Sequence, residues 1–261
     1  MSKRAAESQK REPAARVRLF LEAPFEAGAL VLLPPRALHH LGTVLRLAAG
    51  ASLLVFNGRD GEWRARIERL SRKGGTVRLE RQVRPQLEGA DLRLLFAPVK
   101  RSRLDLVAEK ATELGVAALG PVLTARTNAE RVNLERLRHH VVGAAEQCGR
   151  LTVPGVLEPV RLEDLVSRWD AERRLLFCDE AGGAPIGEAL RREAAGIDAA
   201  RPPRWAVLIG PEGGFASEER AALRRLPQCL PVSLGPRLLR AETAAIAALS
   251  LWQALLGDWH R

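Results

Sequence analysis

Two glycine-proline turns near the C-terminus constrain the fold of this chain more than any other feature. One turn, Gly210-Pro-Glu-Gly-Gly214, follows the short apolar run 205–209, and the other, which begins with Gly235 and Pro236, follows the run 230–234. Each turn leads into a helical pattern. Ligands of open α/β sheets bind where strands end and loops meet helix starts, and glycine lets a main chain approach a ligand closely. We therefore predict that the two turns form one pocket, built largely from main-chain groups.

The hydrophobic pattern from residue 89 onward alternates between short apolar runs and helical spacing. Strands are expected at 92–99, 116–123, 175–178, 205–209 and 230–234, and helices at 102–114, 133–148 and 243–256, with Asn133 and Ser217 as helix N-caps. This alternation predicts an α/β domain with a mainly parallel sheet covered by helices. The last helix is apolar on all sides, so we expect it to be buried in its own domain or against a partner subunit.

Residues 16–88 follow a different period. Apolar and polar residues alternate at 63–67 and 77–80, after an expected strand at 52–56, which predicts a small β-rich domain, interpreted as a barrel. Ahead of these strands, two prolines open a helical segment with three leucines on one face: Leu38, Leu41 and Leu45. Three arginines on the outer faces of the strands either follow a phosphate backbone or are simply solvated: Arg64, Arg66 and Arg78. Residues 1–15 are interpreted as a disordered basic tail, and residues 89–261 as a second domain.

The positive charge is concentrated in the first third of the chain. Of the net charge of +10, residues 1–88 carry +8 and residues 89–261 carry +2. A basic module beside a near-neutral one predicts that the first binds a polyanion and the second carries out the chemistry; an ordinary basic surface is the alternative. The sequence has no apolar run long enough for a membrane span and no secretory signal. Three widely spaced cysteines favour a reducing cytoplasm and argue against a metal site.

The common signatures of nucleotide and hydrolase sites are absent. The sequence has no Gly-x-Gly-x-x-Gly after its first strand, no Gly-x-x-x-x-Gly-Lys-Ser/Thr and no Gly-x-Ser-x-Gly. Dinucleotide redox chemistry, P-loop phosphoryl transfer and serine hydrolysis therefore lack their usual support. The acids and histidines scattered along the expected helices are interpreted as surface or ion-pair residues: Asp105, Glu109, Glu113, His39, His40, His139 and His140.

Five segments in one order carry a specific family resemblance. They are His-Leu-Gly-Thr-Val-Leu-Arg at 40–46, Lys-Ala-Thr-Glu-Leu-Gly-Val at 110–116, Glu-Gln-Cys-Gly-Arg at 146–150, and the two turn segments 209–215 and 234–244. Together they resemble the RsmE family of 16S rRNA uridine N3-methyltransferases. The resemblance implies a PUA-like N-terminal barrel, a C-terminal SPOUT domain with a trefoil knot, and a homodimer. It also implies S-adenosylmethionine as methyl donor and, as partner, 16S rRNA within the small ribosomal subunit.

The resemblance also assigns roles to individual residues. Its cofactor-binding residues would be Cys178, Leu208, Gly210, Pro211, Glu212, Gly213, Leu234, Gly235, Leu238 and Leu239. Its RNA-binding residues would be Arg18, Arg46, Lys100, Arg101, Arg103, Arg126 and Arg150. An arginine near the uracil carbonyl oxygens would favour the imide anion, and a carboxylate could take the N3 proton; the candidates are Arg240 and Glu242. Two alternatives stay open: ribose 2′-O methylation, and a non-catalytic RNA-binding assembly factor.

Overall fold

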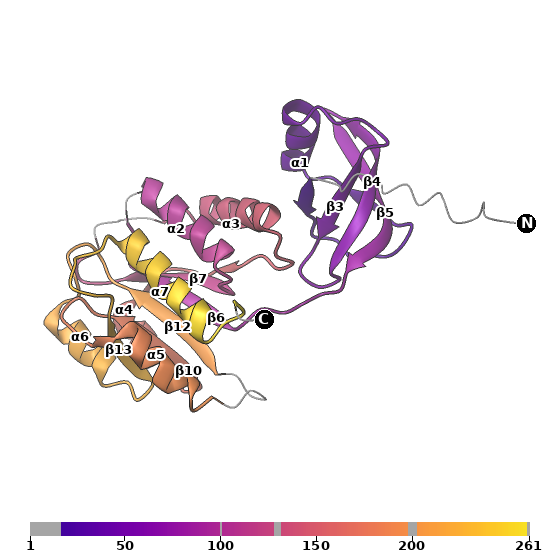
Figure 1. The fold of residues 1–261 in the computed structure, drawn as a ribbon. Helices are drawn as coiled ribbons and strands as arrows, with labels where there is room; N and C mark the ends of the chain where they lie inside the picture. The colour runs from indigo at the N-terminus through magenta and orange to yellow at the C-terminus, as the bar shows by residue number, and fades with distance from the viewer. Residues whose placement is uncertain (1–16, 100, 128–131, 198–202, 260–261) are drawn as a thin grey trace, which may run out of the picture. The chain divides into compact units, whose positions relative to one another are not determined.

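A computed structural model describes residues 17–99, 101–127, 132–197 and 203–259, and the chain divides into two compact units. One unit ends at Leu87 and the other begins at Glu88 (Figure 1). The expected tail at 1–15 and Lys100 lie outside the described residues, and only the backbone of Arg101 is described. Among the described residues, no helix combines the length and the apolar character needed to cross a bilayer.

The N-terminal unit is built on a five-stranded sheet with the order β1-β3-β4-β5-β2. Its strands are β1 (Arg18–Phe20), β2 (Leu30–Leu32), β3 (Ser52–Phe56), β4 (Glu62–Ser71) and β5 (Gly74–Arg84). The pair β1 and β3 is parallel, and the other neighbours are antiparallel. The predicted alternation is confirmed in the middle of β4 and β5, where alternate residues are buried in one cluster: Ala65, Ile67, Val77 and Leu79.

The segment ahead of β3 differs from the prediction of a single helix face. Helix α1 (Pro35–His39) passes directly into a π-helical turn, η1 (His40–Val44), in which the Leu45 N–H donates to the His40 carbonyl at 2.9 Å. A π turn holds more residues than an α turn, so the prediction was wrong for Leu45, which is 38% exposed while Leu41 is fully buried.

The C-terminal unit contains an eight-stranded sheet whose path reads β11-β13-β10-β12-β6-β7-β8, with β9 paired to β7. Its strands are β6 (Leu92–Phe96), β7 (Ala118–Leu123), β8 (Gly155–Val156), β9 (Val160–Arg161), β10 (Arg173–Cys178), β11 (Ala184–Pro185), β12 (Arg204–Ile209) and β13 (Cys229–Ser233). All of these pairs are parallel, which confirms the predicted parallel sheet. The central strands β10 and β12 are buried along most of their length, as strands covered on both faces must be.

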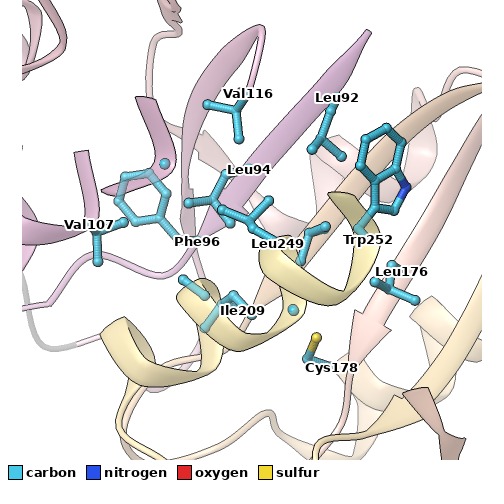
Figure 2. Close-up of a cluster of buried hydrophobic side chains, with 14 of the residues drawn as sticks. Leu92, Leu94, Phe96, Val107, Val116, Leu176, Cys178, Ile209, Leu249 and Trp252 are labelled. Atoms are coloured by element: carbon cyan, nitrogen blue, oxygen red, sulfur yellow. The ribbon is translucent and has the colours of Figure 1, made fainter. Parts of the chain in front are cut away.

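Helices pack on both faces of this sheet. They are α2 (Arg101–Glu113), α3 (Leu134–Cys148), α4 (Leu162–Ser167), α5 (Ile186–Ala194), α6 (Ser217–Arg224) and α7 (Ala241–Leu255). One cluster joins alternate strand residues to α2, α3, α5 and α7, and the other joins the intervening strand residues to α4 and α6. Figure 2 shows the first cluster, in which Leu249 of α7 lies near Leu94 of the sheet and Trp252 of α7 lies near Leu92.

Two helix starts differ from the sequence predictions, and one agrees. Asn133 caps α3, because its Oδ1 accepts the Arg136 N–H at 2.9 Å. The N-cap of α6 is Ala216 instead of Ser217, and the Glu219 carboxylate accepts the Ala216 N–H. Helix α7 begins at Ala241, two residues earlier than expected, and places Glu242 in its first turn.

Candidate active site

A cavity of about 750 Å³ lies at the carboxyl ends of three adjacent strands, β10, β12 and β13. Its walls come mainly from the segments that follow these strands, at 178–180, 209–212 and 232–241. The two glycine-proline turns therefore meet at one pocket. Its volume falls within the range of about 300–1,000 Å³ typical of small-molecule sites, and its position follows the rule for open α/β sheets.

The first turn depends on two glycines. A Cβ on Gly210 would lie 2.4 Å from Phe215 Cε2, and a Cβ on Gly214 would collide with the Glu180 carboxylate. Gly214 has a φ of +68° and donates its N–H to the Pro211 carbonyl at 2.9 Å. Phe215 is itself fixed edge-on against Phe177, with 5.1 Å between the ring centroids. This loop is therefore a tight turn closed over a buried aromatic ring.

The second turn is more open. Gly235 has a φ of +107°, a conformation that residues with a Cβ rarely adopt, and within the described part of the chain no heavy atom beyond its own and its two neighbours' lies within 4 Å of the position its Cβ would take. Leu238 lines the cavity with 86% of its surface exposed. This loop presents main chain and the Leu238 side chain to the cavity, and the Gly235 N–H donates to Ser233 Oγ at 3.2 Å.

Cys178 forms part of the cavity floor, where β10 ends beneath α7 (Figure 2). Burial raises the pKa of its thiol to about 12. The side chain therefore stays protonated at neutral pH and contributes an apolar surface instead of a nucleophile.

A buried ion cluster supports the loop after β10. The Asp179 carboxylate is fully buried and accepts from Arg220 Nε at 2.9 Å and from Arg224 Nη2 at 2.7 Å. Burial by itself raises the pKa of Asp179, but hydrogen bonds from Arg224, the Ala181 N–H and Arg220 outweigh it, so the pKa lies below its ordinary value. Glu180 adds a second contact to Arg220 at 2.6 Å. These bonds connect the loop after β10 to α6.

The proposed catalytic pair lies at the start of α7. Arg240 is the N-cap of α7, lines the cavity, and has no ionic or hydrogen-bonding partner for its guanidinium among the described residues. The Glu242 side chain is 13% exposed, with Oε1 3.7 Å from Arg103 Nε. Its Oε2 is buried without a hydrogen-bond partner in the described part of the chain.

Two family models match the chain. The model described as an RNA methyltransferase domain covers residues 86–253, and the model described as an RNA methyltransferase PUA domain covers residues 33–80. The ribosomal RNA small subunit methyltransferase E of Rickettsia conorii is 32% identical over 212 residues, which are 81% of this chain and 84% of that protein. The chain belongs to the ribosomal RNA small subunit methyltransferase E family. The Synechocystis member is 34% identical over 232 residues, 87% of this chain and 74% of that protein.

Solved structures of this methyltransferase family have the same fold. A putative methyltransferase from Legionella pneumophila, in complex with the bound cofactor SAM, has a TM-score of 0.81 and 34% identity over 93% of this chain and 98% of that chain. The ribosomal RNA small subunit methyltransferase E of Neisseria gonorrhoeae, bound to S-adenosyl methionine, has a TM-score of 0.80 and 27% identity over 93% of this chain and 99% of that chain.

Most of the residues that family resemblance assigned to the cofactor line the cavity. They are Cys178, Gly210, Pro211, Glu212, Leu234, Gly235, Leu238 and Leu239. Two others do not line it: Leu208 is fully buried in the core under α4 and α6, and the Gly213 carbonyl accepts a hydrogen bond from Arg126 Nη1 at 2.8 Å.

The arginines assigned to RNA have diverse surroundings. Arg18 is bound at 2.6 Å to Glu62 and lies over the Phe56 ring, and Arg150 donates to the Thr112 carbonyl and to Thr152. Arg46 is exposed, with a φ of +52°. On the outer faces of β4 and β5, two further arginines pair with glutamates of the neighbouring strand: Arg66 with Glu80, and Arg78 with Glu68.

Sequence reasoning missed four polar residues at the cavity. Among the unassigned residues, Asp179, Glu180 and Ser233 line it, as does Arg237, and Arg103, which the resemblance assigned to RNA, also lines it. Asp179 and Glu180 directly follow an expected strand, just as Gly210 does, so the rule that located the two turns could have located them too. The position of Arg103 had no comparable signal, because it depends on where α2 packs.

Proposed function

We propose that this chain transfers a methyl group from S-adenosylmethionine to N3 of a uridine in 16S rRNA of the small ribosomal subunit. The observation that carries the proposal is the cavity at the ends of β10, β12 and β13, in a family whose solved members hold this cofactor. The residues at the cavity suit the cofactor and the acceptor in different ways.

The cofactor combines an adenine, a sulfonium and an amino-acid end. Leu234, Leu238 and Leu239 would supply apolar walls for a flat base, and the main chain of the same segment would supply hydrogen-bonding groups beside them, apart from the Gly235 N–H, which donates to Ser233 Oγ. The lining also includes the carboxylates of Glu180 and Glu212, each paired with an arginine, Arg220 and Arg103 respectively, and a cationic sulfonium near either carboxylate would be attracted to it. When bound, the cofactor supplies an electrophilic methyl group.

The acceptor must lose its N3 proton, and two residues at the start of α7 would assist: Arg240, which lines the cavity, and Glu242, which follows it by two positions and is not among the lining residues. Arg240 lines the cavity and has no described partner, so its guanidinium is available to the carbonyl oxygens that flank N3. Stabilising charge on those oxygens favours the imide anion. Glu242 has one carboxylate oxygen without a hydrogen-bond donor, and it would accept the proton. The site would also hold the N3 atom in line with the methyl carbon and the sulfur of the cofactor. Such orientation can lower the barrier by about 7–11 kcal/mol in well-aligned systems.

The proposal extends to the rest of the chain. Residues 16–88 would form a PUA-like barrel that binds RNA, and residues 89–261 a SPOUT methyltransferase domain with a trefoil knot; the matches to both family models support this division. The chain would act in the cytoplasm, where ribosomes are assembled. Arg46 and Arg126 would contact phosphates, while Arg18 and Arg150 would anchor structure through their internal bonds.

A homodimer is part of the same proposal. Leu106 of α2 and Leu251 of α7 are large apolar side chains that stay more than a third exposed on two helices in contact with each other. A second subunit would cover them. Light scattering of the purified chain tests this, and a monomer at micromolar concentration would contradict it.

Two measurements test the function. Titration calorimetry with S-adenosylmethionine should give saturable binding, and its absence would favour a non-catalytic assembly factor. Nucleoside analysis of rRNA from a strain that lacks the gene should show the loss of a 3-methyluridine, which returns with the wild-type gene. Loss of a 2′-O-methylated nucleoside instead would identify ribose methylation.

A further inference from the structure

Arg103 lies between two carboxylates at the edge of the cavity. It stands in the first turns of α2, its Nη1 is bound to Glu212 Oε1, and its Nε lies 3.7 Å from Glu242 Oε1. The side chain is 27% exposed and lines the cavity. One arginine therefore connects three segments: α2, the loop after β12 and the start of α7.

The charges around Arg103 argue against a role as a phosphate contact. Arg103, Glu212 and Glu242 together carry a net charge of −1 when all are ionised. An RNA phosphate that approached this guanidinium would meet two carboxylates within the same group, and like charges at short distance repel. The arrangement is suited to orienting the carboxylates instead.

The second carboxylate oxygen of Glu242, Oε2, suggests why Arg103 orients this side chain. Arg103 lies on the Oε1 side, while Oε2 is buried and has no donor among the described residues. Buried polar atoms in folded proteins almost always have a partner, and an exception calls for a specific reason. Glu242 is not among the residues that line the cavity, so a bound substrate that supplied the missing donor would first have to displace the atoms that cover Oε2. The start of α7 also favours a negative charge at this position, because helix N-termini carry partial positive charge.

We propose that Arg103 is a positioning residue for methyl transfer, which holds the Glu242 carboxylate oriented toward the acceptor base and, through Glu212, fixes that carboxylate relative to the cofactor loop. This inference rests on the proposed function. Arg103 does not touch the reacting atoms itself. Its loss leaves Glu212 and Glu242 without the cation between them, so Glu242 turns away from the acceptor while the RNA still binds.

The test compares Arg103→Gln, Arg103→Lys and Glu242→Gln with the wild-type chain in a methylation assay on small ribosomal subunits. We expect Arg103→Gln to lower kcat about 10²-fold, the size of effect that a displaced catalytic group produces. The KM for the subunit and the calorimetric Kd for S-adenosylmethionine should change less than about threefold. Arg103→Lys keeps the positive charge but loses the planar guanidinium, which can donate two parallel hydrogen bonds. Its kcat should be about tenfold higher than that of Arg103→Gln.

A double-variant cycle separates positioning from independent contributions. If Arg103 acts through Glu242, the chain with both Arg103→Gln and Glu242→Gln is no slower than Glu242→Gln alone. Arg138→Gln serves as the control, because Arg138 is an exposed arginine on α3 outside the cavity, 3.5 Å from Glu158. It should behave as wild type. Thermal unfolding of each variant checks that the fold is retained.

Other outcomes would overturn the inference. A rise in KM with strong salt dependence and an unchanged kcat would make Arg103 a phosphate contact, and additive effects in the double variant would remove its link to Glu242. If the wild-type chain transfers no methyl group, the proposed function fails and the inference fails with it. If the wild-type chain is active and Arg103→Gln is equally active, the inference alone fails.

Discussion

Phe215 packs against the backbone of Gly210 so closely that a methyl group on Gly210 would lie 2.4 Å from its ring. Phe215 is 1% exposed and held edge-on by Phe177, so the ring cannot move aside. Gly210→Ala must therefore displace the loop that lines the cavity. We expect a loss of about 1–3 kcal/mol in the free energy of unfolding, together with weaker binding of S-adenosylmethionine.

Gly213→Ala is the matched control for this substitution. A Cβ at Gly213 would lie 3.6 Å from the aliphatic part of Arg126, an ordinary van der Waals distance. Its stability should stay within about 0.5 kcal/mol of wild type. Urea unfolding and calorimetry of both variants check the pair, and equal stability of the two would contradict the steric explanation.

Arg240→Ala should abolish methylation without affecting the fold. The guanidinium makes no bond to the described part of the chain, so its removal should change the free energy of unfolding by no more than about 0.5 kcal/mol. Loss of one stabilising donor should lower kcat by about 10²–10³-fold. Single-turnover assays and thermal unfolding measure the two effects, and retained turnover would exclude Arg240 from the mechanism.

Asp179→Asn should destabilise the C-terminal unit strongly. The fully buried carboxylate is bonded to both Arg220 and Arg224, and removing one partner of a buried ion pair typically costs about 3–5 kcal/mol. Glu180→Gln is the control, because Glu180 is 37% exposed and bonds only Arg220 among the described arginines; it should cost about 1 kcal/mol or less. Denaturant titration of both variants distinguishes them.

The lowered pKa of the Asp179 carboxyl group determines how the stability of the chain should depend on pH. The pKa of Asp179 is lowered in the folded chain, as is that of Asp91, which accepts a hydrogen bond from the buried Arg173. A carboxylate whose pKa is lower in the folded chain than in the unfolded chain stabilises the fold. This contribution is complete at pH values above the unfolded-state pKa, about 3.9 for aspartate, and it is lost as the pH falls through the folded-state pKa. The wild-type chain should therefore lose stability steeply below about pH 4. The Asp179→Asn variant should lose less stability over the same pH interval. If the free energy of unfolding falls in parallel for the two proteins, Asp179 is not the source of the pH dependence.

The three cysteines should differ in reactivity. Cys148 is exposed, whereas burial raises the pKa of Cys178 to about 12 and that of Cys229 to about 11. Because the thiolate is the reacting form, iodoacetamide at pH 8 should label Cys148 first in the native chain. Mass spectrometry after timed labelling measures the order, with a sample in urea as the control in which all three react. Early labelling of Cys178 would show that the cavity floor opens.

The local parts of the fold could be predicted from the sequence. An apolar run before Gly210 predicted a strand at 205–209, and β12 ends at Ile209, as predicted. The Asn133 cap was equally local and is confirmed. The π turn at 40–44 was missed because the leucine spacing there also fits an α-helix.

The parts that depend on distant pairings could not be predicted. Asp179 meets Arg220 across 41 residues and Arg224 across 45, and no local pattern identifies such partners. The family resemblance assigned Arg103 to RNA binding, and its sequence neighbours gave no sign of its carboxylate partners. Only the packing of α2 beside the loop after β12 places it next to Glu212, 109 residues away.

Strand β10 pairs on one side with β12 and on the other with β13, both of which follow it in the chain. The three loops around the cavity therefore assemble only after residue 233 has been synthesised and has joined the sheet. Long-range parallel pairing of this kind forms slowly. A nascent copy that has not reached this point would have no place to capture a methyl donor, so each molecule would acquire its cofactor only after β13 has joined the sheet.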